Sequence, residues 1–318
     1  MYSIVVPVYR NLDALPGLVE ALSDVGATIL RQFGLQLEVV FVIDGSPDNE
    51  YASLERMLPG APFASKLILH SRNFGSFAAI RTGLRTASGD YFATIAADLQ
   101  EPPELLVGFL AKLKEDNCDI VVGVRSNRDD PALTAFSAGL FWRLYRSFVI
   151  RDIPAGGVDL FACNRRVRDE LVSMEEANSS LIGLVFWVGF RKSEVVYERR
   201  ARKYGKSAWT FRKKLKYLAD SVFAFTDLPI KILNMLGIVG VLFSLIFGLV
   251  VLLVRLIGGV KVPGYTPIIL TIIFFGACNL IGLGLVGAYA WRSYENTKRR
   301  PLSIVREYRH FDGTQEKS

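Results

Sequence analysis

Short apolar runs alternate with amphipathic stretches along the first part of the chain. Runs rich in β-branched and aromatic residues predict strands at Tyr2 to Val8, Leu37 to Ile43, Ser65 to Leu69, Tyr91 to Ala96 and Asp119 to Val124. Helix-like stretches lie between or beside them at Leu12 to Phe33, Tyr51 to Leu58, Phe77 to Ala87 and Pro103 to Glu115. Strands that are apolar on both faces, separated by helices, predict an α/β fold with a mostly parallel sheet covered on both faces. Ligands of such sheets bind at the carboxyl ends of the strands.

Two long uncharged runs follow in the last third of the chain. Leu236 to Val254 and Thr266 to Ala290 are each about long enough to cross the hydrocarbon core of a bilayer as a helix. A buried hairpin of a soluble protein is the alternative, but two such lengths without a charge argue against it. The pattern predicts a transmembrane hairpin.

The distribution of basic residues predicts the orientation of this hairpin. The connector from Arg255 to Tyr265 carries only two basic residues, whereas clusters of Lys and Arg precede the first run and follow the second. By the positive-inside rule, both long flanking segments are cytoplasmic. Residues Phe211 to Phe225 place apolar side chains at helical spacing between basic ones, which predicts a helix in the membrane interface.

Composition agrees with a membrane-bound protein. Hydrophobic residues make up 51% of the 318 residues, and the mean hydropathy is +0.29. The net charge is +7, and much of the excess flanks the apolar runs, so it favours anionic lipid headgroups over nucleic acid. Cys118, Cys163 and Cys278 lie far apart, without metal-ligand spacing, and are expected to be reduced. The N-terminus does not have the pattern of a signal peptide.

Three acidic residues lie where predicted strands end. Asp44 follows a buried run and precedes Gly45 and Ser46, and Asp98 follows Tyr91 to Ala97 and precedes a proline-rich helix start. A carboxylate at Asp98 could hold Mg²⁺ or Mn²⁺ against a diphosphate, because hard cations take carboxylate and phosphate oxygens. Helix capping or turn formation is the alternative for both residues. Asp159 follows a pair of glycines that permit close approach of a ligand or form a turn.

Several motifs together resemble one family. The motifs are Pro7-Val8-Tyr9-Arg10-Asn11, Ile43-Asp44-Gly45-Ser46, Ser71-Arg72-Asn73-Phe74-Gly75, Asp98-Leu99-Gln100-Glu101-Pro102-Pro103-Glu104 and Tyr204-Gly205-Lys206-Ser207. In order and spacing the chain resembles family 2 glycosyltransferases, and most of all the subgroup that makes polyprenyl-phosphate or dolichyl-phosphate sugars. The likeness continues through both apolar runs to Tyr294 to Pro301.

The resemblance implies a GT-A fold, an inverting mechanism, a divalent cation (Mg²⁺ or Mn²⁺) and a nucleotide-sugar donor, with a UDP-sugar as the expected one. It implies that Asp98 and Asp159 are catalytic, that Asp98 is the metal ligand, and that the acceptor is undecaprenyl or dolichyl phosphate. The donor-binding residues it implies are Pro7, Tyr9, Asp44, Ser46, Arg72, Asp98 and Gln100. Candidates for the acceptor phosphate are Arg125, Arg200, Arg202 and Lys206, although a solvated or lipid-facing charge is an equal alternative for each.

The expected division of the chain has four parts. Residues 1–208 form a cytoplasmic GT-A catalytic domain, 209–229 a juxtamembrane amphipathic helix, 230–291 two transmembrane helices (about 232–255 and 266–290), and 292–318 a cytoplasmic tail. The expected location is a bacterial inner membrane, with both termini in the cytoplasm and the product used for cell-envelope glycans or glycolipids. Small residues along the second span, such as Gly276 and Gly282, would permit a homo-oligomer.

The chain departs from the family pattern in two places. Relatives have Asp-x-Asp after the fourth strand, whereas this chain reads Ala96-Ala97-Asp98, and Phe161 stands where relatives commonly have Arg. A non-catalytic membrane scaffold derived from this fold is therefore an alternative function. A processive polysaccharide synthase is disfavoured because its Gln-x-x-Arg-Trp motif is missing from the sequence. A transporter is disfavoured because the apolar runs carry no charge for a substrate path.

Overall fold

A computed structural model describes residues 1–115, 118–126, 146–147, 150, 152–154, 157–176, 179–200, 219–257 and 265–313. The strands are β1 (Tyr2–Val8), β2 (Leu37–Ile43), β3 (Ala64–His70), β4 (Tyr91–Thr94), β5 (Ile120–Arg125), β6 (Val158–Asn164), β7 (Lys192–Tyr197) and β8 (Val305–Phe311). The α-helices are α1 (Leu15–Phe33), α2 (Glu50–Met57), α3 (Ser76–Thr86), α4 (Leu105–Lys114), α6 (Arg165–Ser173), α7 (Leu181–Trp187), α9 (Leu228–Leu256) and α10 (Tyr265–Thr297).

The described strands form one sheet in the order β7-β5-β6-β4-β1-β2-β3-β8. β1 pairs in parallel with β2 and β4, β2 pairs in parallel with β3, and β5 pairs in parallel with β7. β6 runs antiparallel to β4 and β5, and β8 runs antiparallel to β3. The predicted α/β fold with a mostly parallel sheet is confirmed.

Helices cover both faces of this sheet because its central strands are apolar on both faces. One core lies under α1, α2 and α4 and includes Ile4 of β1. The other lies under α3, α6 and α7 and includes Val5 of the same strand. Alternate residues of β1 therefore enter opposite cores, as the two-residue period of a strand requires.

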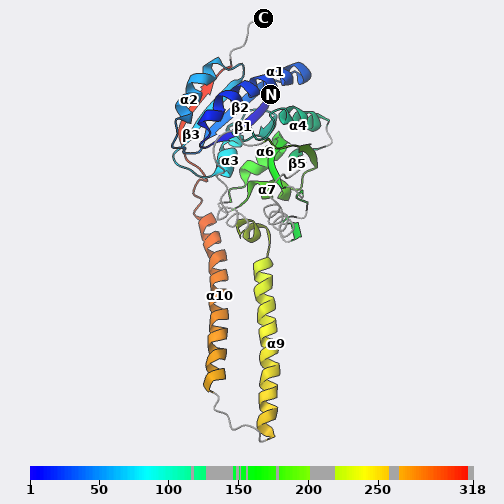
Figure 1. Ribbon diagram of the computed structural model, residues 1–318, viewed down its shortest axis with the longest axis vertical. Helices are drawn as coiled ribbons and strands as arrows, with labels where there is room; N and C mark the ends of the chain where they lie inside the picture. The colour runs from blue at the N-terminus through cyan, green and yellow to red at the C-terminus, as the bar shows by residue number, and fades with distance from the viewer. Residues whose placement is uncertain are drawn as a thin grey trace.

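The helices α9 and α10 are long and apolar enough to cross a membrane, in agreement with the predicted hairpin. They extend side by side from the globular part of the chain (Figure 1), and Gly282 of α10 lies beside the side chain of Leu233 of α9. Residues 219–225, within the predicted interfacial segment, form a helical stretch before α9, while 211–218 lie outside the described residues.

The segment after α10 returns to the sheet as β8. This strand was not predicted, because its sequence, Val-Arg-Glu-Tyr-Arg-His-Phe, is highly charged. Charged residues are common on edge strands, where they discourage pairing with other chains. The ion pair between Arg309 of β8 and Glu55 of α2, at 2.6 Å, ties the strand to the domain.

The apolar stretch from Leu181 to Phe190 divides between core and surface. Leu181 to Phe186 are buried in α7, whereas Trp187 at the end of the helix is 65% exposed. Cys118 and Cys163 are buried and Cys278 is exposed, and all three are free cysteines.

Candidate active site at the carboxyl edge of the sheet

The candidate site residues gather at one edge of the sheet because of the strand directions. β1 to β4 are parallel, so the segments after Val8, Ile43, His70 and Thr94 emerge at the same edge. β5 and β7 run in the same direction as these strands, since both β5 and β4 are antiparallel to β6. β6 runs the opposite way, so its beginning, with Asp159, lies at this edge too.

Asp98 lies on a sharply bent loop after β4. It is 7% exposed, and its Oδ1 atom accepts a hydrogen bond from the amide of Gln100 at 3.3 Å. Leu99, between them, has φ +55°, a left-handed conformation that non-glycine residues rarely adopt. Its side chain packs against the core under α1. Strain of this kind costs about 1–3 kcal/mol and is concentrated at functional sites.

Asp159 is held by two side chains from neighbouring strands. Arg125 of β5 forms an ion pair with its carboxylate, and the hydroxyl of Tyr197 of β7 donates a hydrogen bond to Oδ2 at 3.0 Å. Burial and then the negative charge of Asp159 raise the pKa of Tyr197 well above its usual range. Burial tends to lower the pKa of Arg125, but Asp159 and Tyr197 outweigh it and raise that pKa. Arg125 is therefore firmly cationic and Tyr197 firmly neutral.

Glu101 belongs to the same group, although no role for it was predicted from the sequence. The side chain is 2% exposed and lies 3.4 Å from Arg199, measured between Oε1 and Nη2. Burial, with added repulsion from Asp98 and Asp159, raises the pKa of Glu101 to about 7, while Arg199 opposes the shift. Its position in the Asp98-Leu99-Gln100-Glu101 motif was the only signal in the sequence, because burial of a single glutamate cannot be read from a pattern.

The residues present fit a divalent cation shared with a substrate. No group of three or more His, Cys, Asp or Glu side chains arranged for a metal occurs among the described residues. Mg²⁺, however, is usually held by one or two carboxylates together with substrate phosphates and water. Asp98, which is 7% exposed at the carboxyl edge of the sheet, can supply one such carboxylate. The acidic groups of Glu101 and Asp159 lie close enough to Asp98 to belong to the same charged group.

The donor-binding candidates after β1 and β2 lie in two connected loops. Pro7, within β1 near its end, and Tyr9, directly after β1, are half-buried. The hydroxyl of Ser46 accepts from the amide of Arg10 at 3.1 Å. The same hydroxyl donates to Oε1 of Glu50 at 2.9 Å, and that oxygen also accepts from the Asn11 amide. Glu50 is fully buried and is a second site residue for which no role was predicted from the sequence.

Asp44 is buried and bonded within the protein. Its carboxylate accepts hydrogen bonds from the amides of Phe74 and Gly75, at 2.8 and 2.7 Å, and contacts Nδ1 of His70 at 2.9 Å. These bonds fix the turn from Ser71 to Gly75, which presents Arg72 on the surface with its guanidinium over the ring of Phe74. The structure thus brings Asp44, Ser46 and Arg72 together.

Two of the four acceptor candidates, Arg125 and Arg200, lie among the described residues. Arg200 lies beside the Asp98 loop, since its amide donates to the carbonyl of Gln100 at 2.9 Å and its guanidinium lies 3.3 Å from Glu104. Arg199, which was not predicted, donates to Oε1 of Gln100 at 2.8 Å. Arg202 and Lys206 lie outside the described residues. Ala96, in place of the family's first carboxylate, is half-buried.

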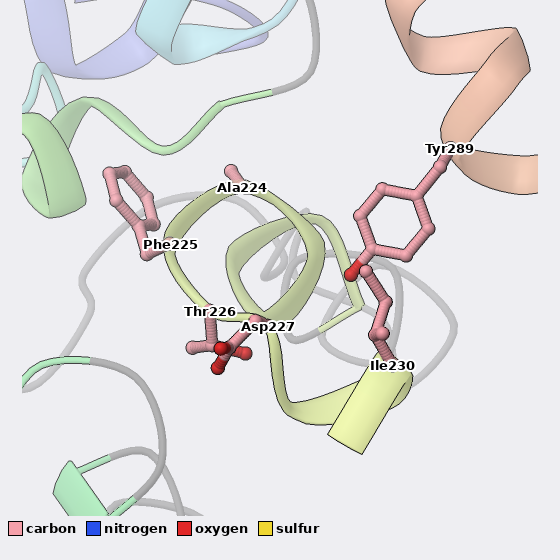
Figure 2. A pocket seen from close by; sticks show the side chains of 6 residues that line it. All are labelled: Ala224, Phe225, Thr226, Asp227, Ile230 and Tyr289. Atoms are coloured by element: carbon pink, nitrogen blue, oxygen red, sulfur yellow. The ribbon is translucent and has the colours of Figure 1, made fainter. Parts of the chain in front are cut away.

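A shallow cavity of about 520 Å³ lies between the start of α9 and the end of α10. Figure 2 shows the ring of Tyr289 from α10 pointing toward Ile230 of α9, with Thr226 and Asp227 on the turn before α9. None of the charged residues around Asp98 and Asp159 lines this cavity, so it is separate from the site described above.

Comparison with known proteins shows the family. Residues 3–172 match the model of glycosyl transferase family 2. An uncharacterized glycosyltransferase of Synechocystis, sll0501, is 33% identical over 95% of this chain and 94% of its own length. A prophage bactoprenol glucosyl transferase homolog of Escherichia coli is 29% identical over 96% of this chain and 98% of its own. An undecaprenyl-phosphate 4-deoxy-4-formamido-L-arabinose transferase of Klebsiella pneumoniae is 29% identical over 95% and 92%.

Proposed function

The chain belongs to glycosyl transferase family 2 and is a glycosyltransferase, and we propose that it transfers a sugar from a nucleotide-sugar to polyprenyl phosphate with inversion at the anomeric carbon. Relatives named for undecaprenyl phosphate and bactoprenol support the lipid acceptor. The proposed donor is a UDP-sugar, on the subgroup resemblance alone. The proposed product serves glycan or glycolipid modification of the cell envelope.

One structural observation supports a lipid acceptor: the edge of the sheet that holds Asp98 and Asp159 is the edge at which the chain returns from α10. α10 ends at Thr297, and the chain enters β8 at Val305. Val305 pairs with His70, the last residue of β3, and the amide of Ser71 donates to the carbonyl of Ile304 at 2.9 Å. The carboxyl ends of the parallel strands, and with them Asp98, are therefore at the end of the domain next to the membrane helices (Figure 1).

The chemistry makes few demands on a general base. A phosphate monoester is already ionised near neutral pH, so the enzyme has to align it and stabilise the leaving nucleoside diphosphate. Arg125 would bind the acceptor phosphate, and Asp159, held by Arg125 and Tyr197, would orient it toward the anomeric carbon. A cation held by Asp98 and the donor diphosphate would offset the charge on the leaving group.

The proposed organisation follows the expected division of the chain. Residues 1–208 carry catalysis, 209–229 lie in the interface, 230–291 cross the membrane twice and 292–318 return to the cytoplasm. The basic clusters on both flanks of the spans support a cytoplasmic catalytic domain in a bacterial inner membrane. We propose that the hydrocarbon chain of the acceptor enters between α9 and α10, beside the cavity that Tyr289 and Ile230 line.

The test is product formation by detergent-purified full-length protein. UDP-, GDP- and dTDP-sugars are supplied with or without polyprenyl phosphate and with Mg²⁺, Mn²⁺ or chelator, and both nucleoside diphosphate and lipid product are measured. The proposal expects turnover with one donor that requires both lipid and cation, and its loss in Asp98→Ala. Turnover without lipid would contradict the proposed acceptor, and full activity of Asp98→Ala would contradict the role of that carboxylate. Absence of turnover with every donor would contradict the proposed reaction and favour the scaffold alternative raised by Ala96.

A further inference from the structure

A row of polar side chains, buried at Asp44, His70 and Thr82 and half-buried at Ser303, connects the segment after the second span to the donor loops. Nδ1 of His70 lies 2.9 Å from Oδ1 of Asp44, and Nε2 of His70 lies 2.9 Å from the hydroxyl of Thr82 on α3. The Thr82 hydroxyl lies 2.7 Å from that of Ser303, two residues before β8. Asp44, His70 and Thr82 are between 1% and 8% exposed, so water cannot readily replace these contacts.

The acceptors in this row set the direction of its hydrogen bonds. A carboxylate only accepts, so Nδ1 of His70 carries a proton and donates it to Asp44. The Thr82 hydroxyl lies 2.9 Å from Nε2 and 3.0 Å from the carbonyl of Ala78, to which it also donates. Because the one proton of this hydroxyl is used in these contacts, the Ser303 hydroxyl donates to the Thr82 oxygen. Each group thus orients the next, from Ser303 to Asp44, and such coupled buried bonds stabilise one arrangement.

The row ends on the backbone that shapes the donor loop. Asp44 holds the amides of Phe74 and Gly75, and Gly75 has φ +101° directly before α3. Gly45 packs so closely on the backbone of Arg72 and Asn73 that a Cβ atom would have no space there. The segment after the span also contacts the other end of the turn, through the Ser71 amide and the Ile304 carbonyl.

We propose that Ser303, Thr82 and His70 are positioning residues for the nucleotide-sugar, which act through Asp44 on the turn from Ser71 to Gly75. The segment after the second span then helps to position the donor loop, in addition to forming an edge strand. The inference rests on the proposed function, because it needs the donor to bind at this turn. It also explains why both oxygens of Asp44 are used inside the protein: the carboxylate shapes the loop that contacts the nucleotide.

The chain offers matched controls for the two hydroxyl groups. Thr82→Val breaks the row, whereas Thr86→Val removes a hydroxyl on the same helix whose partners among the described residues are the backbone carbonyls of Thr82 and Gly83. Ser303→Ala breaks the row at its far end, whereas Ser65→Ala removes a buried hydroxyl of β3 that has no partner among the described residues. Ser303→Thr keeps a hydroxyl at the far end and serves as the rescue variant.

The experiment measures UDP, GDP and dTDP binding by calorimetry and steady-state kinetics for these full-length variants in detergent, below their thermal unfolding midpoints. Thr82→Val and Ser303→Ala are expected to weaken nucleotide binding and to raise KM for the donor by about fivefold to tenfold, with kcat and KM for the lipid within about twofold. Ser303→Thr, which keeps a hydroxyl, should have the same donor KM as the unmodified protein. A merely structural role would lower the unfolding midpoint without separating donor KM from lipid KM.

Two outcomes would overturn the inference. One is that Thr82→Val and Ser303→Ala bind nucleotide and donor no more weakly than Thr86→Val and Ser65→Ala. The other is an equal change of donor KM and lipid KM. Failure of the proposed function looks different, because the unmodified protein would then neither bind a nucleoside diphosphate nor form product, and the positioning role would fail with it.

Discussion

Arg125 on β5 and Asp159 on β6 form an ion pair at the edge of the sheet where the parallel strands end. Tyr197 on β7 donates to the same carboxylate, so three strands hold one acidic side chain. The pair places a firmly cationic group beside the acid proposed to lie at the reacting centre. While the site is empty, Asp159 neutralises the charge of Arg125. The arginine therefore needs no other partner before an anionic acceptor binds.

Arg125→Ala is expected to lower kcat/KM for polyprenyl phosphate by about a hundredfold, because two charge-assisted hydrogen bonds are lost. Arg125→Lys should recover only part of this, since an ammonium lacks the planar fork of a guanidinium. Initial rates at varied lipid concentration provide the measurement. Arg56→Ala, on the exposed side of α2, is the control. An unchanged lipid dependence in Arg125→Ala would remove this residue from the acceptor site.

Ala96→Asp is expected to lower the half-saturating concentration of Mg²⁺ or Mn²⁺ by about tenfold, because it adds a second carboxylate beside Asp98. Without metal, the added charge repels Asp98 and Glu101, so the unfolding temperature should fall, and it should recover when metal is added. Ala96→Asn has nearly the same size without the charge and controls for packing. Equal metal dependence in both variants would contradict a metal site beside Ala96.

Gly45→Ala is expected to destabilise the domain by more than 2 kcal/mol and to weaken donor binding. Its φ of +57° disfavours a side chain, and the backbone of Arg72 occupies the space that a Cβ atom needs. Gly34→Ala is a matched control, because Gly34 also has a positive φ, +66°, but has open space around its Cβ position. Gly34→Ala should lower the free energy of unfolding by only about 1 kcal/mol. Thermal unfolding and nucleotide binding distinguish the two variants.

The ion pair between Glu38 and Lys66, at 2.9 Å, predicts a pH dependence of stability. Burial tends to raise the pKa of Glu38, but hydrogen bonds from Ser3, Lys66 and the Ser88 amide outweigh it, and the pKa lies below the ordinary 4.5. The unfolded state therefore binds the proton more tightly. This contribution to stability is present above about pH 4.5 and is lost as the pH falls through the folded pKa.

The measurement for this pair is the unfolding temperature between about pH 3 and pH 6. Glu38→Gln should have a flatter profile than the unmodified protein across this range. Lys66→Met should be destabilised by about 3–5 kcal/mol at neutral pH, because it leaves a buried carboxylate without its cation. Parallel profiles for the unmodified protein and Glu38→Gln would show that other carboxyl groups dominate acid unfolding.

Local pattern by itself determined the first five strands, the helices between them and the two long apolar helices near the end of the chain. A run such as Leu37 to Ile43 is apolar at nearly every position because both of its faces are buried, and this is visible without knowing its neighbours. The position of Asp98 at the end of a strand follows in the same way. Motif order then identified the family before any contact was known.

Only the tertiary structure determined which hydrogen bonds and strand pairings these residues form. β8 is charged and has no strand-like alternation, so its pairing with β3 depends on an edge that is formed by residues far away in the chain. The burial of Glu101 and the bonds that join Asp44 to Ser303 arise only when separate elements pack together. Hydrophobic periodicity records how one element is buried, whereas a hydrogen bond depends on two positions whose separation in the sequence carries no information about their distance in space.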